Sequence, residues 1–235
     1  MRRRLLSMYQ GLYGRLGPQG WWPGRSRFEV IVGAILTQNT NWGNVEKAIR
    51  RLRRERMLSP SAMSALSRRH LGVLIRPAGT FGVKARRLHN FLTVLRKGYG
   101  GSLRRMFREE PARLRETLLQ VSGIGPETAD SILLYAGKMP VFVVDAYTKR
   151  IFSRHRLISD NALYHEVQTL IMNHLPRDAR LYNEYHALLV AVGKAYCRSI
   201  PRCDSCPLRP DLERHRIPLP QRAVKSRERR VEGRL

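Results

Sequence analysis

Hydrophobic side chains recur every three or four positions through most of the chain. Two clear examples are the sets Phe28, Ile31, Val32, Ile35 and Leu88, Phe91, Leu92, Leu95. This spacing places the apolar residues of a segment on one face of an α-helix. The pattern therefore predicts amphipathic helices that bury their apolar faces in a shared core.

Capping residues and prolines set the expected starts of several helices. Asn41 and Ser59 carry side chains that accept hydrogen bonds from the free N–H groups of a first turn, and Pro60 suits the turn itself. Between Asn41 and Ser59, apolar residues alternate with arginines, which predicts one packed face and one basic face. Further helices are expected over residues 3–15, 84–97, 162–173 and 179–194.

The segment 111–136 is expected to form two helices joined by a tight turn. Pro111 suits the start of the first helix and Pro126 the start of the second, while Gly123-Ile124-Gly125 forces the chain to reverse between them. The missing side chains of the glycines let backbone approach a ligand, and N–H groups at the start of the second helix point outward. Such a hairpin suits a phosphate group, although the same turn also occurs as a plain corner between helices.

The residues after this hairpin are apolar and end in an acid. Residues 140–144, PVFVV, have the β-branched content of a buried strand, but no partner strand is evident elsewhere in the sequence. We therefore predict an extended crossing and an all-α protein without an internal repeat. Asp145 follows at the expected start of a helix, where the N–H groups stabilise an anion. From position alone, Asp145 is either a reactive carboxylate near the hairpin or simply a helix cap.

The charge of the chain indicates a polyanionic partner. Lys and Arg number 44 against 18 Asp and Glu, which leaves a formal charge of +26. An excess of this size over a globular length favours nucleic acid. No stretch of the sequence approaches the roughly 18 to 20 apolar residues of a membrane span, so we expect a cytoplasmic protein that associates with the nucleoid through DNA. The start, which has no acid before Glu29, leaves an organelle-targeting peptide as the alternative.

Three segments together resemble a known family of DNA repair enzymes. The segment from Leu118 to Phe152, LLQVSGIGPETADSILLYAGKMPVFVVDAYTKRIF, is similar to the helix-hairpin-helix and Asp motif of the endonuclease III superfamily of DNA glycosylases. WWPG at 21–24 and FEVIVGAILTQNTNW at 28–42 resemble the branch that contains the 3-methyladenine DNA glycosylase III enzymes. GKAYCRSIPRCDSCPL resembles the iron–sulfur loop of the superfamily. Joint matching of this kind, from about Trp21 to Leu208, is specific.

The resemblance implies an enzyme that flips a damaged nucleotide out of duplex DNA and breaks the bond between base and deoxyribose. Asp145 would stabilise the cationic sugar and activate the attacking water. Gln38 would fill the gap left by the flipped nucleotide, unless its amide only makes a capping or loop hydrogen bond. The residues expected at the DNA are Gln38, Val121, Gly123, Ile124, Gly125 and Thr128.

One position departs from the pattern of the strand-cleaving members of the superfamily. Their hairpin carries a Lys whose amine attacks the sugar and forms a Schiff base, whereas this chain has Glu127 there. A carboxylate forms no imine, so we expect a glycosylase without an efficient lyase step, in which Glu127 joins Asp145 as a candidate catalytic residue. Among the lysines, Lys149, one helical turn after Asp145, is the one expected near the sugar.

The tryptophans indicate the class of base. Alkylation makes a purine cationic, which weakens its glycosidic bond and attracts the ring to indole faces. The expected base pocket consists of Trp21, Trp22, Pro23, Trp42 and Glu127. Without the resemblance, Trp21 and Trp22 would be interpreted as packing residues.

Three cysteines lie close together near the end of the chain, in the pattern C-x5-C-x2-C. Clustered thiols in a cytosolic chain argue for a metal or a cluster and against a disulfide framework. The resemblance implies a 4Fe-4S cluster on Cys197, Cys203 and Cys206, but Leu212 stands where the superfamily has its fourth Cys. The alternatives are a cluster that is absent or labile, or a fourth ligand from Asp211, Glu213 or His215.

The predicted organisation is an all-α, two-lobed helix-hairpin-helix DNA glycosylase fold. Residues 28–139 would form a central helical barrel with the hairpin, residues 1–27 and 140–220 a second lobe with the Cys loop, and residues 221–235 a basic tail. The expected partner is double-stranded DNA with a damaged base, bound by a monomer that does not associate with membranes.

Two other functions stay open at this point. One is an endonuclease III-type glycosylase that removes oxidised pyrimidines, against which Glu127 argues because it cannot supply the usual lyase chemistry. The other is a non-catalytic DNA-binding module that uses only the hairpin and the basic surface.

Overall fold

The computed structural model describes residues 1–219, and every regular element in that range is helical. The all-α prediction is confirmed for these residues, which contain no β-strand. Residues 140–144 run without regular structure between two helices, in agreement with the predicted crossing. The predicted basic tail, 221–235, lies outside the described residues.

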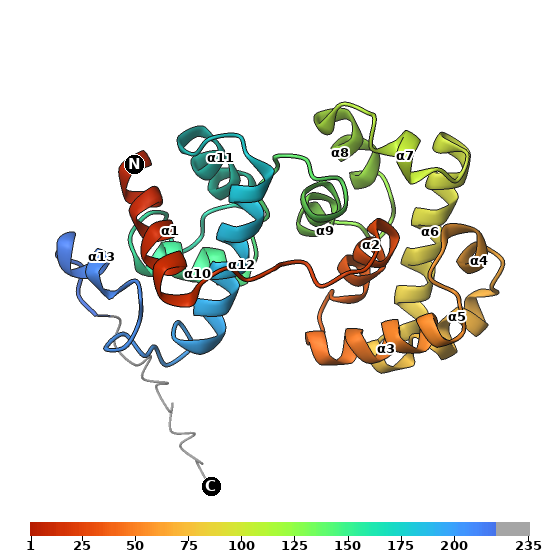
Figure 1. Ribbon diagram of the computed structural model, residues 1–235, viewed down its shortest axis with the longest axis horizontal. Helices are drawn as coiled ribbons and strands as arrows, with labels where there is room; N and C mark the ends of the chain where they lie inside the picture. Colours follow the sequence, from red (N-terminus) through yellow and green to blue (C-terminus); the bar gives the residue numbers. More distant parts are fainter. Residues whose placement is uncertain (220–235) are drawn as a thin grey trace, which may run out of the picture.

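Two groups of helices occupy opposite ends of the molecule (Figure 1). One end contains α1 (Arg2–Leu16), α10 (Ala146–Arg154), α11 (Tyr164–His174), α12 (Ala179–Ala195) and α13 (Arg209–Arg214). The other contains α2 (Arg27–Leu36), α3 (Trp42–Arg54), α4 (Pro60–Ser64), α5 (Arg68–Leu74), the 3-10 turn η1 (Arg76–Ala78), α6 (Phe81–Tyr99), α7 (Leu103–Met106) and α8 (Pro111–Leu119). Between them lie α9 (Pro126–Ser131) and the π-helical turn η2 (Ile132–Ala136). The N-terminal helix thus packs with the C-terminal helices, and the division into domains at residues 28 and 140 stays a prediction.

The predicted helix starts are fixed by side-chain caps. Asn41 Oδ1 accepts a hydrogen bond from Asn44 N at 3.1 Å, and Ser59 Oγ accepts one from Ala62 N at 3.2 Å. Each bond satisfies an N–H group that a first helical turn leaves free. Helices α5, α7 and α13 were not predicted, because segments of 7, 4 and 6 residues are too short to display a periodic apolar face.

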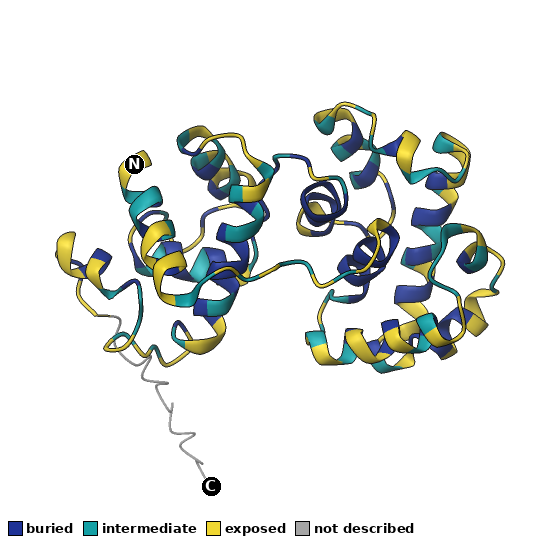
Figure 2. Cartoon of the chain, viewed as in Figure 1, coloured by how far each residue is buried: buried dark blue, intermediate teal, exposed yellow. Residues whose placement is uncertain are grey.

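The core of each group of helices is mainly apolar, and Figure 2 shows where the buried residues lie. Lys84 of α6 is one of the charged side chains buried among them, and it lies at the end of α2. Lys84 is 1% exposed and donates from Nζ to Leu36 O at 2.8 Å and to Ala78 O at 2.7 Å. Burial lowers the pKa of this lysine. Because a cation suits the carbonyl end of a helix, Lys84 fixes the point at which the chain leaves α2 for residues 37–41.

Asp130 ties the hairpin to the crossing segment. Its carboxylate is fully buried and accepts hydrogen bonds from Arg115 Nε at 2.6 Å, Tyr164 OH at 2.7 Å and Gln168 Nε2 at 2.8 Å. Gln168 Nε2 also donates to Phe142 O at 2.7 Å. One buried acid therefore links α8, α9 and α11 to residues 140–144, which lead directly to Asp145.

Candidate active site

A cleft of about 990 Å³ lies where the hairpin, α10 and α12 face one another. Most predicted site residues line it, although they come from distant parts of the sequence: Trp21, Trp22, Gln38, Trp42, Gly123, Ile124, Gly125, Glu127, Thr128 and Asp145. Pro23 is exposed and Val121 is buried, and neither lines the cleft. The fold thus brings together candidate residues for the sugar, the base and the phosphate.

Asp145 uses its two carboxylate oxygens differently. Oδ1 accepts hydrogen bonds from Thr148 N at 2.7 Å and from Thr148 Oγ1 at 2.9 Å, so this oxygen caps α10. Oδ2 lies on the side of His186, 3.7 Å from Nε2, and the side chain is 13% exposed. The cap interpretation therefore accounts for one oxygen and leaves the other for the cleft.

Glu127 is the second acid of the cleft. It belongs to the first turn of α9, and its side chain is open to the cleft. Desolvation between the cleft walls raises the pKa of Glu127 to about 7, and the nearby charge of Asp145 contributes to the rise. The group therefore gains and loses its proton near neutral pH.

The hairpin turns at a residue that must be glycine. Gly123 has φ +95°, and a Cβ added there would lie 2.4 Å from Cγ of Arg87. Arg87 comes from α6 and was not predicted, because that helix carries three arginines and only the fold shows which of them reaches the hairpin. The arginine side chain thus packs directly over the hairpin and lines the cleft.

Gln38 is held against the same hairpin. Its Nε2 donates to Gly123 O at 3.1 Å and to Thr128 Oγ1 at 2.8 Å, while its Oε1 accepts from Arg87 Nη1. Gln38 therefore makes loop hydrogen bonds, which is the alternative role predicted for its amide. The side chain nevertheless lines the cleft at its hairpin side.

The tryptophans form a cluster that is partly packed and partly open. Trp22 packs edge-on against Trp21 and Trp42, with ring centroids 5.4 Å and 5.3 Å apart, and lies 5.1 Å from the ring of Tyr135. All three indoles are half-buried and line the cleft. Each ring therefore packs against its neighbours and also lines the cleft, and the base-pocket role of the tryptophans stays a prediction.

The lysine of the cleft is Lys194 and not Lys149. Lys194 lines the cleft and places Nζ 5.8 Å from the centroid of the Trp21 ring. Lys149 is absent from the lining, because one turn carries it along α10 and away from the helix start that faces the cleft. The expectation that Lys149 lies near the sugar is therefore not met.

A buried histidine and tyrosine behind Asp145 were also missed from the sequence. His186 is 5% exposed, lines the cleft, and shares a hydrogen bond between Nδ1 and Tyr135 OH. Burial lowers the pKa of His186, and the charge of Asp145 opposes that shift. Burial also raises the pKa of Tyr135 well above its usual value, so the phenol keeps its proton. No motif marks either residue, and a lone His on an apolar helix is ordinarily a packing residue.

The three cysteines lie away from this cleft. Cys197, Cys203 and Cys206 line a small cavity of about 20 Å³ together with the aliphatic side chains of Leu208 and Leu212. Within residues 1–219, no group of three or more His, Cys, Asp or Glu side chains is placed to hold a metal ion. Leu212, at the expected position of a fourth ligand, supplies a hydrocarbon wall.

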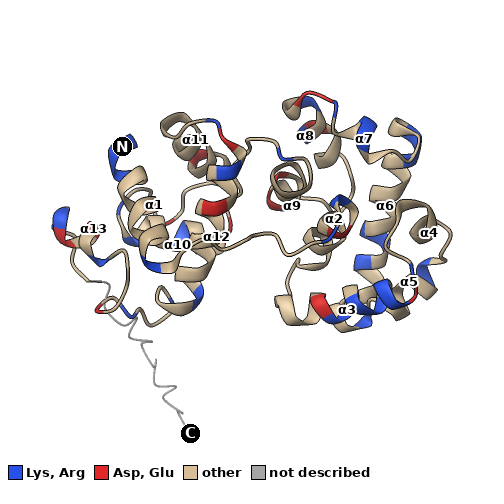
Figure 3. Cartoon of the chain, in the orientation of Figure 1, with Lys and Arg blue, Asp and Glu red and all other residues tan. Residues whose placement is uncertain are grey.

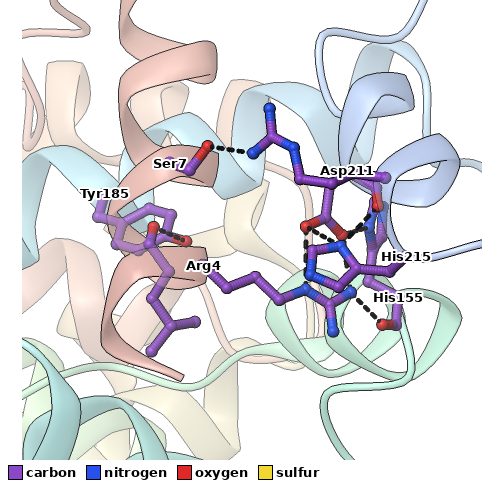
Figure 4. A network of polar contacts seen from close by, with 8 residues as sticks. Arg4, Ser7, His155, Tyr185, Asp211 and His215 are labelled. Atoms are coloured by element: carbon purple, nitrogen blue, oxygen red, sulfur yellow. Dashed lines mark hydrogen bonds and ion pairs between the residues drawn. The ribbon is translucent and has the colours of Figure 1, made fainter.

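Asp211 is committed to a different network, which joins α1 to the last helix (Figure 4). It accepts hydrogen bonds from Arg4 Nε at 2.9 Å and Arg4 Nη2 at 2.8 Å, and it bonds His155 Nδ1 at 2.7 Å. Burial alone would raise the pKa of Asp211, but the bonds to His155 and Arg4 outweigh it and hold the pKa far below its usual value. Asp211 therefore has no free oxygen for a metal, and Glu213 is likewise paired, accepting from Arg209 Nε at 2.6 Å. His215, the third candidate for a fourth ligand, bonds Asp211 O through Nδ1 at 2.9 Å. Four protein ligands for a cluster are therefore not assembled among residues 1–219.

Positive charge is spread over the end of the molecule that carries the hairpin. Lys and Arg positions crowd α3, α6 and α7 (Figure 3), and the exposed basic face of α3 agrees with the alternation seen in its sequence. Such a surface attracts the backbone of a nucleic acid.

Comparisons with known proteins agree with this arrangement. Residues 32–177 match the HhH-GPD superfamily of base excision DNA repair proteins. A protein of Methanocaldococcus jannaschii, assigned as a DNA repair glycosylase, is 44% identical over 212 residues, which cover 87% of this chain and 94% of that protein. Endonuclease III of Thermotoga maritima is 28% identical over 190 residues, which cover 80% of this chain and 84% of the enzyme.

Two solved structures extend the likeness to three dimensions. The H. pylori 3-methyladenine DNA glycosylase bound to 1,N6-ethenoadenine has a TM-score of 0.69 at 28% identity, covering 82% of this chain and 96% of that one. A non-covalent complex of endonuclease III with DNA has a TM-score of 0.76 at 22% identity, covering 92% and 99% of the two chains. The second similarity concerns the fold alone.

Proposed function

The chain belongs to the HhH-GPD superfamily of base excision DNA repair proteins and is a DNA glycosylase, and from this premise we propose that it is monofunctional and releases alkylated purines by hydrolysis. One observation carries the proposal. Glu127 stands in the cleft at the hairpin position where strand-cleaving members of the superfamily carry their reactive Lys.

In the proposed reaction, the damaged nucleotide leaves the duplex and enters the cleft beside the hairpin. Positive charge develops on the deoxyribose as the bond between C1′ and the base nitrogen lengthens. Asp145 Oδ2 faces the cleft and supplies the opposing negative charge. Water then adds to C1′ and gives its proton to Asp145, while the base departs with the bonding electrons. A cationic purine leaves as a neutral base and therefore needs no strong general acid.

The proposed base pocket combines aromatic faces with a carboxylate. Trp21, Trp22 and Trp42 present indole rings to the cleft, and such rings attract a cationic base. Glu127 adds a negative charge whenever it is ionised. Lys194 lies over one face of Trp21, so we propose that the base stacks between the remaining indole surfaces.

The hairpin is the proposed grip on the DNA backbone. Gly123 and Gly125 leave the backbone of residues 123–125 open to a phosphate, and Arg87 adds a fixed positive charge beside them. Thr128 and Ile124 line the same side of the cleft. Gln38, which we propose to fill the space of the flipped nucleotide, is positioned by its bonds to Gly123 and Thr128.

For the cysteine loop, the donor set supports the alternative in which a 4Fe-4S cluster is absent or labile. Three thiols share one cavity, but a fourth thiol is missing and Asp211 is engaged with Arg4 and His155. Iron content of protein purified without air decides the matter. Four iron atoms per chain and a brown colour would restore the cluster, whereas colourless, iron-free protein that is folded and active would remove it.

The proposed partner is double-stranded DNA with a damaged base, bound by a monomer in the cytoplasm at the nucleoid. Neighbouring structures in this fold include a complex with DNA, which supports the nucleic-acid partner. No helix within residues 1–219 has the length and hydropathy that a membrane crossing requires.

A glycosylase assay tests the proposal. Duplexes that carry 3-methyladenine or an oxidised thymine are incubated with the protein and then treated with hot alkali, which cleaves at abasic sites. We expect release of 3-methyladenine by the wild-type protein and its loss in Asp145→Asn. Release of oxidised thymine alone would favour the endonuclease III-type alternative. Equal results for both proteins, with binding retained, would leave only a DNA-binding module.

Strand cleavage is the second candidate activity, and Lys194 is the observation that favours it, because its amine lines the cleft. Borohydride reduction of a Schiff base would trap a covalent protein–DNA complex if this amine attacked the sugar. We expect no trapped complex. A trapped complex that disappears in Lys194→Ala would overturn the monofunctional proposal.

A further inference from the structure

His186 carries an unused hydrogen-bonding group at the edge of the reaction cleft. Its ring is 5% exposed, and Nε2 has no hydrogen-bond partner among the described residues. The nearest charged atom is Asp145 Oδ2 at 3.7 Å, beyond the distance of a direct hydrogen bond. A buried polar atom without a partner is costly, so an arrangement of this kind is retained where a ligand or water completes it.

The hydrogen bond at the other ring nitrogen, Nδ1, determines whether Nε2 carries a hydrogen toward Asp145. Nδ1 is bonded to Tyr135 OH, and the phenol has one proton, which it retains. We assign the phenol as the donor to Nδ1, because no other acceptor for its proton lies within hydrogen-bond distance among the described residues, and the neutral ring then carries its own hydrogen on Nε2. An N–H donor is thereby directed to the same side as the one carboxylate oxygen of Asp145 that does not cap α10.

We propose that His186 positions the water that attacks the sugar, with Tyr135 holding the ring in the required tautomer. A water that bridges Nε2 and Oδ2 would complete the hydrogen bonding of two atoms that no described residue bonds. The water oxygen accepts from Nε2–H and donates one hydrogen to Oδ2, which leaves a lone pair for C1′. As the new C–O bond forms and the C1′–N bond breaks, the water proton moves to Asp145 and the base leaves with the electron pair. This inference rests on the proposed hydrolysis and assigns it a residue that touches the nucleophile.

The surroundings support a positioning role for the pair. Tyr135 lies in the π-helical turn η2, and its ring contacts Trp22 of the base pocket. His186 lies on α12 and packs near Phe142 of the segment that leads to Asp145. The donor and the acceptor for the water thus come from two separate helices that pack against each other, and insertions of the π type, such as η2, often occur at functional sites.

Single-turnover release of 3-methyladenine from a duplex measures the role of each group. His186→Leu fills the space without a donor and should slow release at least ~30-fold, as expected for loss of a group that orients a reacting water. His186→Gln offers an amide N–H near the position of Nε2 and should stay within about fivefold of wild type. Tyr135→Phe should slow release about tenfold. Tyr182→Phe is the matched control, since it removes another buried phenol, on the helix that carries His186 but outside the cleft.

Two further readouts separate water positioning from a structural role. The melting temperature of His186→Gln should stay near that of wild type, and the affinity of every variant for a duplex with a tetrahydrofuran abasic analogue should equal that of wild type. Wild-type rates in His186→Leu would overturn the inference, and so would a slow His186→Gln of normal stability. If wild-type protein released no base from any duplex, the hydrolysis itself would be wrong, which is a different result from equal rates in all variants.

Discussion

Asp145 and Asp211 each lie near a helix start with a histidine beside them, yet the cleft and the C-terminal network use these acids in opposite ways. At the C-terminal end, both oxygens of Asp211 are taken by Arg4 and His155. At the cleft, one oxygen of Asp145 caps α10 and the other has no hydrogen bond among the described residues. A carboxylate whose oxygens are all satisfied holds elements together, whereas one with an unused oxygen in a cleft is available for chemistry.

The largest effect on the rate of base release is expected from replacing Asp145, whose Oδ2 has no hydrogen bond among the described residues. Asp145→Asn should lower the rate of base release about 10³-fold, because the amide removes the negative charge beside the sugar cation. The melting temperature should not change, since Asn is as good a helix cap as Asp. Single-turnover kinetics and thermal unfolding check both statements. A variant that is equally active, or that is inactive only because it unfolds, would contradict the assignment.

The opposite outcome is expected for Asp211, whose two carboxylate oxygens are both hydrogen-bonded. Asp211→Asn leaves Arg4 and His155 without a charged partner and should reduce the free energy of unfolding by about 3 kcal/mol. Single-turnover activity at low temperature should stay near wild type, because the network lies outside the cleft. The control is Asp204→Asn, whose side chain is 90% exposed beside Arg209 and should have no measurable effect. Denaturant unfolding measures both, and equal stabilities would contradict a bridging role for Asp211.

The hairpin offers a test that separates binding from catalysis. Gly123→Ala places a Cβ against Arg87 at a φ that favours glycine, and the affinity for duplex DNA should fall about twentyfold. Gly98→Ala is the control, because a Cβ there meets nothing within 4 Å in the exposed part of α6. Titration of a labelled duplex at fixed salt gives both affinities. Wild-type binding by Gly123→Ala would exclude the hairpin as the grip on phosphate.

The smallest effect concerns the proton on Glu127. Its pKa is raised to about 7, so the side chain is neutral below that pH and negative above it. Release of a cationic 3-methyladenine should therefore increase about fivefold from about pH 6 to about pH 8, because only the ionised form attracts the base. In Glu127→Gln this rise should be absent. If the rate instead falls over the same interval in wild type but not in the variant, neutral Glu127 acts as a hydrogen-bond donor to the base.

The sequence was most informative where a residue is constrained by its neighbours along the chain. Asn41, Ser59 and Asp145 cap helices as predicted, because a cap depends on a few adjacent residues. The glycine hairpin follows the same rule, since Gly123 needs a backbone conformation that other residues rarely adopt. These local signals also carried the resemblance that led to the family.

Residues selected by tertiary structure were missed for a physical reason. Arg87 and His186 reach the cleft from α6 and α12, and their roles depend on which helix face the fold turns toward the hairpin or Asp145. Lys149 was expected near the sugar because it follows Asp145 by one helical turn, but it does not line the cleft. The engagement of Asp211 by Arg4 could not be predicted either, since the two residues are 207 positions apart.

The buried carboxylate of Asp130 holds the hairpin at a fixed distance from the segment that leads to Asp145. By joining the hairpin, α11 and the crossing segment through a single group, it prevents the phosphate grip and the reacting acid from sliding past each other. In the proposed complex, a DNA strand bound at the hairpin would therefore place its sugar at a constant distance from Asp145. Selection among nucleotides would then depend on the shape and charge of the base and not on a change in that distance.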